Sequence, residues 1–315
     1  MADVHFGVTL PQIKRPWEET KAAAIELDRL GFRSLWFNDH LYGVPMPQLP
    51  ILEAWTALAA VGAITERVDL GTLVTPVGFR NPALLAKMAA TLDVITGGRV
   101  IVGLGCGWFQ SEFAGYGMPF PPVRERLEQL DEAATILKML WTEAQPSFAG
   151  RHFQLDATFC EPKPRRQPHP PILIGGGGEK VLLRIAARHA DVWNNLAVHQ
   201  NDLAAKVAKL REHCAAVGRD PASIRIAQQC LVVIGENESD ARAKSEKAAA
   251  IYGGHMGAGG PLGIAGTAAQ CIEKIEAHRA LGCSMFVIEF FGRDVREPAR
   301  LFAERVMPAF GGGPA

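Results

Sequence analysis

The sequence lacks the residue patterns that mark several large classes of protein. Its six cysteines form no Cys-x-x-Cys pair, and no His-x-x-x-His motif or carboxylate cluster is present, so we expect neither a disulfide framework nor a metal site. The spacing of a dinucleotide-binding fingerprint and the Gly-Lys-Ser/Thr ending of a phosphate-binding loop are also absent. We therefore expect any chemistry to come from acid–base side chains or from an organic cofactor.

An excess of one charge and a long apolar segment are missing too. Lys plus Arg (33) equals Asp plus Glu (33), so no overall field favours nucleic acid or an anionic membrane. Residues 1–5 do not show the charged and apolar regions of a signal peptide, and no apolar run is long enough to span a bilayer. These observations favour a cytoplasmic protein with no nucleic-acid or membrane partner.

The chain does contain enough apolar material for a large core, with 48% hydrophobic and 21% charged residues. Buried strand patterns alternate with amphipathic helix patterns along its length. Strands are predicted over residues 4–10, 34–38, 68–75, 99–105, 172–175, 191–196, 224–234 and 285–291. Helices are predicted over residues 18–30, 52–64, 83–95, 124–141, 179–189, 203–217, 239–252, 268–281 and 298–310.

Eight successive strand–helix units predict an α/β fold in which the strands close into a (β/α)8 TIM barrel. A doubly wound open sheet is the alternative, but an open sheet of this width would be strongly twisted. We expect one domain over residues 1–310, a flexible tail over 311–315, and an insertion at about 142–171, after the fourth unit, containing a hairpin and a proline-rich turn. In either fold the functional loops follow the carboxyl ends of the strands.

The polar residues Asn38-Asp39-His40 end the apolar run of the second predicted strand. An acid beside an imidazole at a strand end is typical of the catalytic loops of α/β enzymes. Alternatively, Asp39 caps the next element and His40 is an ordinary loop residue. The local sequence does not decide between these two interpretations.

Four glycines, Gly175 to Gly178, separate a buried strand from the predicted helix that begins at Glu179. Their bare amides at a helix amino terminus favour an anion site, and we expect phosphate binding there. The alternative is a tight turn that needs positive φ angles.

Other strand ends offer surfaces for a planar ligand. The third strand ends at Thr75-Pro76, where Thr75 either lines such a ligand or simply precedes the proline that stops the strand. Aromatic side chains in the neighbouring segments belong either to the core or to a cofactor site. They are Trp108, Phe109, Phe113, Tyr116, Phe120 and Trp193.

Taken together, the motifs resemble the luciferase-like flavin and deazaflavin oxidoreductases, and within them the branch that uses coenzyme F420. The similarity extends over nearly the whole chain. The matching stretches are Leu35 to Gly43, Leu70 to Pro76 with Arg80 to Pro82, Leu92 to Arg99, Gly103 to Trp108 with Glu112, and Ile174 to Glu179.

The resemblance implies a barrel of the bacterial-luciferase type, usually a homodimer, that holds the deazaflavin at the carboxyl ends of its strands. It implies that His40 exchanges a proton with the substrate as hydride moves to or from C5, while Asp39 hydrogen-bonds the ring or orients the imidazole. It also implies a bulge with a non-proline cis peptide at Leu73-Val74-Thr75. The tail phosphate would lie on the amides of Gly176, Gly177, Gly178 and Glu179.

We expect further cofactor contacts from Val74, Thr75, Gly105 and Gly107, and a substrate pocket that includes Tyr42, Trp108, Glu112 and His255. The sugar-phosphate dehydrogenases of the family have a glutamate where this chain has Trp108, so glucose-6-phosphate dehydrogenase activity is not expected. The substrate, the reaction direction and the preferred tail length stay open. Two alternatives are an FMN-dependent monooxygenase on the same barrel and a non-catalytic deazaflavin-binding protein.

Overall fold

A computed structural model describes residues 4–44, 46–253, 256–257 and 259–313. Eight parallel strands close into a barrel, because β1 pairs with β12 and β9 pairs with β10. In barrel order they are β1 (His5–Thr9), β2 (Ser34–Phe37), β3 (Asp69–Thr72), β5 (Val100–Gly105), β8 (Ile172–Gly175), β9 (Val192–Asn195), β10 (Arg225–Ile234) and β12 (Cys283–Phe290). The predicted (β/α)8 TIM barrel and its eight strands are thus confirmed.

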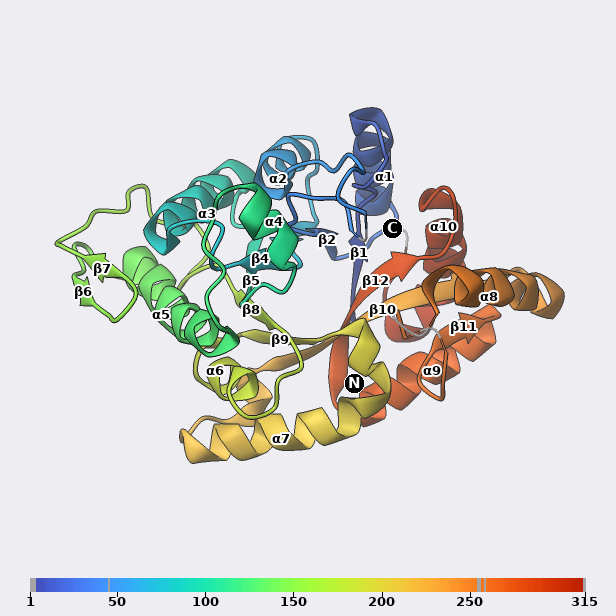
Figure 1. Ribbon diagram of the computed structural model, residues 1–315. Helices are drawn as coiled ribbons and strands as arrows, with labels where there is room; N and C mark the ends of the chain where they lie inside the picture. Colours follow the sequence, from blue (N-terminus) through green and yellow to red (C-terminus); the bar gives the residue numbers. More distant parts are fainter. Residues whose placement is uncertain (1–3, 45, 254–255, 258, 314–315) are drawn as a thin grey trace.

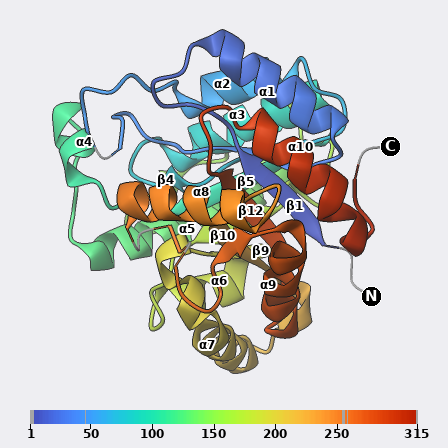
Figure 2. The same ribbon diagram turned by 90° about the vertical axis from the view of Figure 1, so that its right-hand side faces the viewer.

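Helices surround the strands on all sides in Figure 1. They are α1 (Trp17–Arg29), α2 (Ala54–Gly62), α3 (Pro82–Thr96), α5 (Val123–Thr142), α6 (Leu182–His189), α7 (Leu203–Ala216), α8 (Glu238–Tyr252), α9 (Ala268–Ala280) and α10 (Arg296–Arg305). In Figure 2, α1 and α10 lie next to each other, consistent with their contacts. No helix among the described residues combines the length and apolar character needed to cross a bilayer.

Several elements differ from the sequence prediction. The helix α4 (Gln110–Gly115) lies in a segment predicted as loop, and the short strand β11 (Ile264–Gly266) extends the sheet beside β10. The last predicted helix is split, with α10 followed by a 3-10 turn over Met307–Phe310. The insertion does contain the predicted hairpin, formed by β6 (Phe148–Ala149) and β7 (Gln154–Leu155).

Two boundary corrections have clear physical reasons. The third predicted strand, 68–75, is interrupted by a cis peptide between Leu73 and Val74, and it resumes as β4 (Thr75–Pro76), which pairs with β5. Helix α6 begins at Leu182 rather than at 179. Gly176 has a φ of +141°, which no helical residue adopts, so the glycine run forms a loop before the helix starts.

The barrel interior is filled from several strands. Trp36 is fully buried there with Leu73, Ile101, Leu173, Val192, Ala227, Met285 and Val287. A Cβ atom added to Gly71 would collide with the Trp36 ring, and one added to Gly7 would lie 2.5 Å from its indole nitrogen. These glycines therefore provide the space for the largest side chain of the interior.

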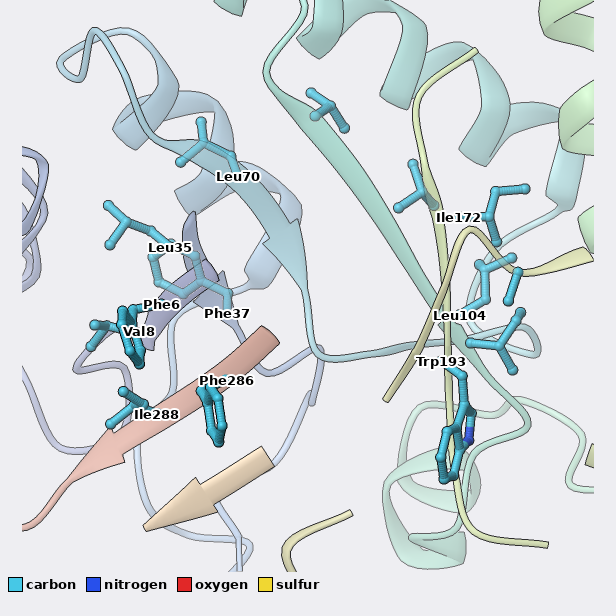
Figure 3. Packing of buried hydrophobic residues seen from close by; sticks show 14 of the residues in the cluster. Phe6, Val8, Leu35, Phe37, Leu70, Leu104, Ile172, Trp193, Phe286 and Ile288 are labelled. Atoms are coloured by element: carbon cyan, nitrogen blue, oxygen red, sulfur yellow. The ribbon is translucent and has the colours of Figure 1, made fainter. Parts of the chain in front are cut away.

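A second, larger core lies between the strands and the helices. Alternate residues of each strand point outward into it, because successive strand side chains face opposite sides of a sheet. Figure 3 shows outward residues of β1, β2, β3 and β12 as one group, including Phe6, Leu35 and Phe286. Leu104, Ile172 and Trp193 form another group from β5, β8 and β9. Packing within this apolar layer fixes the positions of the helices against the strands.

Candidate active site

The loops after β2, β3, β5, β8 and β9 meet at one end of the barrel, because the carboxyl ends of parallel strands share an edge. Gln12 fixes the backbone at the end of β2. Its amide nitrogen donates to Asn38 O (2.8 Å) and Leu52 O (2.6 Å), and its oxygen accepts from Asn38 N (3.0 Å). The following residues, Asp39 and His40, are thereby held at the barrel mouth.

His40 is paired with Glu112 from α4. Its Nδ1 lies 3.0 and 3.1 Å from the two Glu112 carboxylate oxygens, and Leu41 N donates to Glu112 Oε2 at 3.0 Å. The Glu112 side chain is 1% exposed, whereas the His40 side chain is 17% exposed. A carboxylate can only accept, so Nδ1 carries the proton, and Nε2 is an acceptor that has no protein partner in the part of the chain that the structure describes.

The resemblance implied that Asp39 hydrogen-bonds the deazaflavin ring or orients the His40 imidazole. In the structure the second of these roles belongs to Glu112. The buried Asp39 carboxylate accepts from Thr75 Oγ1 (2.7 Å) and from Arg80 (2.7 and 3.3 Å), while Glu112 rather than Asp39 contacts His40. Arg80 also donates to Glu53 at 2.5 Å. Burial raises the pKa of the Asp39 carboxyl, and the Arg80 guanidinium opposes that rise. Asp39 thus ties the end of β2 to the segment that carries Thr75.

Thr75 is the centre of this buried network. Its hydroxyl accepts from Trp55 Nε1 (3.0 Å) and contacts Thr72 Oγ1 (3.0 Å) while it donates to Asp39. The network holds the backbone on the carboxyl side of the Leu73–Val74 peptide, which is cis. The expected position of a non-proline cis peptide is therefore confirmed.

Val74 occupies the middle of the barrel mouth. A Cβ on Gly105 would lie 2.6 Å from a Val74 methyl group, and a Cβ on Gly175 would lie 2.9 Å from the other. Gly103 is restricted by the backbone oxygen of Thr72 and by Val74, and Gly107 by Phe113 and a φ of +75°. Gly105 and Gly107, the predicted cofactor contacts, thus leave room for the neighbouring side chains of Val74 and Phe113.

The loop of Gly176 to Glu179 has free backbone donors. In the described part of the chain, the amide N–H groups of Gly177, Gly178 and Glu179 have no protein acceptor. Lys206 of α7 supports the loop from beneath, where its side chain is 5% exposed and its ammonium contacts Gly177 O (2.8 Å) and Glu179 Oε1 (3.3 Å). A cation close to several free amides favours the binding of an anion at this loop.

Asn194 presents a second set of unsatisfied groups. It is 1% exposed, and neither its side-chain nitrogen nor its side-chain oxygen has a hydrogen-bond partner among the described residues. It pairs in register with Gly175 on β8 and Ala227 on β10, one inward position beyond Val192. An unpaired buried amide costs about 1–3 kcal/mol, so its place beside the mouth is consistent with a ligand-binding role.

Aromatic rings line the approach to His40. The Trp108 ring meets the imidazole edge-on with centroids 5.7 Å apart, and it stacks on Phe109 at 5.2 Å. Trp108 is 64% exposed. Tyr42 lies against Tyr116, with ring centroids 5.7 Å apart.

The structure thus brings His40, Trp108 and Glu112 together, with Asp39 and Thr75 joined in the adjacent network. Two of the aromatic candidates belong to the core: Phe113 is buried, and Trp193 is buried with its indole nitrogen bonded to Gly176 O (2.9 Å). His255 lies outside the described residues.

Sequence reasoning missed four residues of this region: Gln12, Trp55, Asn194 and Lys206. Gln12 and Asn194 had a usable signal, since each is a polar residue at or after the end of a predicted strand. Trp55 and Lys206 lie within helix patterns, where a functional contact cannot be distinguished from a packing position or a solvated face. Arg80 was part of the matched motif but had no role assigned.

Comparison with known proteins places the chain in a family. The family model described as luciferase-like monooxygenase matches residues 2–261. The F420-dependent hydroxymycolic acid dehydrogenase of Mycobacterium tuberculosis (strain ATCC 25618 / H37Rv) is 32% identical over 238 residues, covering 75% of this chain and 65% of that protein. The FMNH(2)-dependent dimethylsulfone monooxygenase of Pseudomonas putida is 28% identical over 285 residues, covering 77% of each.

The fold also matches that of solved structures. An F420-dependent secondary alcohol dehydrogenase, solved in complex with an F420–acetone adduct, superposes with a TM-score of 0.81 at 24% identity, covering 98% of this chain and 99% of the other. That likeness establishes the fold, and the family match over residues 2–261 establishes descent. The chain is an enzyme of the luciferase-like monooxygenase family.

Proposed function

We propose that this enzyme is an F420-dependent oxidoreductase that transfers hydride between C5 of the deazaflavin and a small organic substrate. The observation that carries the proposal is the His40–Glu112 pair at the barrel mouth, with Nε2 of His40 left free. When bound, coenzyme F420 supplies the hydride chemistry, and the protein supplies position and proton transfer.

His40 acts in this proposal as the acid–base residue. In the oxidative direction its Nε2 takes the proton of a substrate hydroxyl, and in the reductive direction it returns that proton to the oxygen. Glu112 accepts the Nδ1 proton and keeps the ring in the orientation that presents Nε2 to the mouth. The Trp108 and Phe109 rings meet the imidazole edge-on and border one side of it.

The residues present fit a deazaflavin with an anionic tail. Val74 and Thr75 would support the ring, and the unpaired amide of Asn194 offers one donor and one acceptor next to them. The free amides of Gly177, Gly178 and Glu179, with Lys206 beneath them, would hold the tail phosphate. Asp39 would act through Thr75 and Arg80, by fixing the bulge that carries Val74.

An FMN-dependent monooxygenase is the second candidate, favoured by the similarity to the Pseudomonas putida enzyme. The same amide loop would accept the terminal phosphate of FMN, so the fold does not separate the two. The distinguishing property is reaction with oxygen: a monooxygenase consumes it with reduced flavin, and a deazaflavin dehydrogenase does not.

The test is a parallel titration of the purified protein with F420 and FMN, followed by fluorescence quenching. We expect preferential F420 binding, retained in His40→Asn and lost when Gly177 is replaced by Val, whose side chain would meet His199. His40→Asn should abolish turnover while binding persists, which separates an enzyme from a mere deazaflavin binder. Preferential FMN binding with oxygen consumption would transfer the assignment to the monooxygenase.

We also propose that the chain forms a homodimer through the outer face of α3. Leu84, Val94 and Ile95 are exposed on this helix, 55%, 37% and 58% respectively, which is unusual for side chains of this size. Light scattering of the wild type and of Ile95→Asp should show a dimer that dissociates in the variant. A monomeric wild type would contradict the proposal.

A further inference from the structure

Glu289 lies near the carboxyl end of β12 and faces the barrel interior. Met285 and Val287 of the same strand belong to the interior cluster, and alternation places Glu289 at the next inward position. Strand β12 pairs with β1, and β1 pairs with β2, whose end carries His40. Glu289 and His40 therefore belong to the same barrel mouth, on different sides of it.

Within the part of the chain that the structure describes, the Glu289 carboxyl has one hydrogen-bond partner. Tyr252, the last residue of α8, donates its hydroxyl to Glu289 Oε1 at 3.0 Å. Among residues 4–44, 46–253, 256–257 and 259–313, Glu289 makes no ion pair with a lysine, arginine or histidine. It differs in this respect from Asp39, which is balanced by Arg80.

The surroundings of this carboxyl are apolar. Leu231, its register partner on β10, forms a cluster with Val233, Ala248, Tyr252, Met256, Ala265 and Phe291. Burial raises the pKa of Glu289, and the pKa of Tyr252 is raised as well, first by burial and then by the adjacent carboxyl. A carboxyl in such a site ionises less readily than an exposed one, and it offers a hydrogen-bonding group to a ligand.

A purely structural role would be to join α8 to β12 through the Tyr252 hydroxyl. A glutamine could accept that hydrogen bond without placing an ionisable group among apolar side chains. A carboxyl that is kept at the mouth of an enzyme without a cationic partner among the described residues is better explained by contact with a ligand.

We propose that Glu289 is a specificity-determining residue, which recognises an uncharged hydroxyl or carbonyl group of the substrate and disfavours an anionic group. The hydroxyl or carbonyl forms a hydrogen bond with the carboxyl. The partly buried members of the apolar cluster, Tyr252, Met256, Ala265 and Phe291, border the hydrocarbon part of the same substrate. An anionic group would share apolar surroundings with a second acid, so the two repel each other or one must stay neutral, and no cation among the described residues balances them. The inference rests on the proposed function only in assuming that substrate enters this mouth.

The experiment compares three probes of the same shape: cyclohexanol, cyclohexanecarboxylate and cyclohexylamine. Calorimetry measures their dissociation constants with the full chain, both saturated with F420 and without it. We expect cyclohexanol to bind at least about tenfold more tightly than the carboxylate, since an unpaired polar group discriminates strongly. In Glu289→Gln, carboxylate binding should improve and the difference should fall below about threefold.

Two further variants control the comparison. Glu273→Gln makes the same substitution at an exposed position of α9 and should keep the wild-type discrimination. Tyr252→Phe removes the hydrogen bond but leaves the carboxyl, and it should also keep the discrimination against the anion. Thermal unfolding of each variant checks that the fold is preserved.

Other results would overturn the proposal. Equal binding of alcohol and carboxylate by the wild type, or unchanged discrimination in Glu289→Gln, would remove Glu289 from substrate recognition. Tightest binding of cyclohexylamine would mean that Glu289 acts as an ionised carboxylate. Failure of F420 to bind counts against the proposed function alone, because the comparison without cofactor still tests Glu289.

Discussion

The imidazole of His40 lies against the carboxylate of Glu112, with Nδ1 3.0 and 3.1 Å from the two oxygens. The two residues are 72 positions apart in the sequence and come from loops after different strands. Because Glu112 is buried and also accepts from Leu41 N, it holds both the ring and the backbone that carries the ring. The free Nε2 is the atom that this arrangement leaves for proton transfer.

We predict that Glu112→Gln lowers turnover by at least about 100-fold while F420 affinity changes little, because exchanging the carboxylate that orients a catalytic imidazole for an amide favours the wrong tautomer. The glutamine can donate to Nδ1 and thereby favour the wrong tautomer. Steady-state kinetics, F420 titration and ¹⁵N chemical shifts of His40 test this. An unchanged tautomer with reduced turnover would contradict the positioning role.

Replacing Lys206 by Met should weaken F420 binding by about tenfold, equivalent to 1.4 kcal/mol, and reduce its dependence on salt. The ammonium is the buried cation beneath the amides of Gly177 to Glu179. Fluorescence titrations at two salt concentrations measure both effects. Lys209→Met on the same helix is the control, because that lysine contacts Glu212. Equal effects in the two variants would refute a specific contribution of Lys206.

Gly103→Ala should destabilise the fold by at least about 2 kcal/mol, as expected for an overpacked interior. Its Cβ would collide with the backbone oxygen of Thr72 and lie 3.1 Å from a Val74 methyl group. Gly259→Ala is the matched control, since its Cβ would meet nothing within 4 Å. Urea unfolding of both variants gives the comparison, and similar midpoints would show that the third strand can move to accept the methyl group.

His5 makes stability depend on pH. Burial lowers its pKa from 6.5 to about 3, with Arg225 adding to the effect. Arg225 donates to Nδ1 at 3.2 Å and Ser34 Oγ lies 2.9 Å from Nε2, so the ring is neutral in the folded protein. The unfolded chain takes up a proton near pH 6.5 that the folded protein refuses, so the folded state loses relative stability as pH falls from 6.5 toward 3.

The corresponding test is urea unfolding of the wild type and His5→Asn at pH 7.5 and pH 5.0. The stability advantage of the wild type should shrink by about 2 kcal/mol at the lower pH, from a slope of about 1.4 kcal/mol per pH unit below 6.5. His169→Asn serves as a control outside the barrel interior. A pH-independent difference would mean that His5 is protonated in the folded state as well.

The order of strands and helices was determined by the sequence itself. Continuous apolar runs such as Val100 to Leu104 predict strands covered on both faces. The pattern of residues 83–95 predicts α3, which begins at Pro82, where Asn81 Oδ1 accepts from Ala83 N. These signals are local, because they depend on side-chain periodicity and on the backbone preferences of single residues. The polar loops at the strand ends, with Asp39, His40 and the glycine run, were found in the same way.

The pairing of the functional side chains was decided by the tertiary structure. Nothing local in the sequence indicates that Glu112 rather than Asp39 contacts His40, or that Arg80 balances Asp39, because these partners are brought together by barrel closure. The unsatisfied amide of Asn194 and the buried ammonium of Lys206 depend on burial, which sums contributions from several strands and helices. Chemistry at strand ends can be read from sequence, but hydrogen-bond partners require the closed barrel.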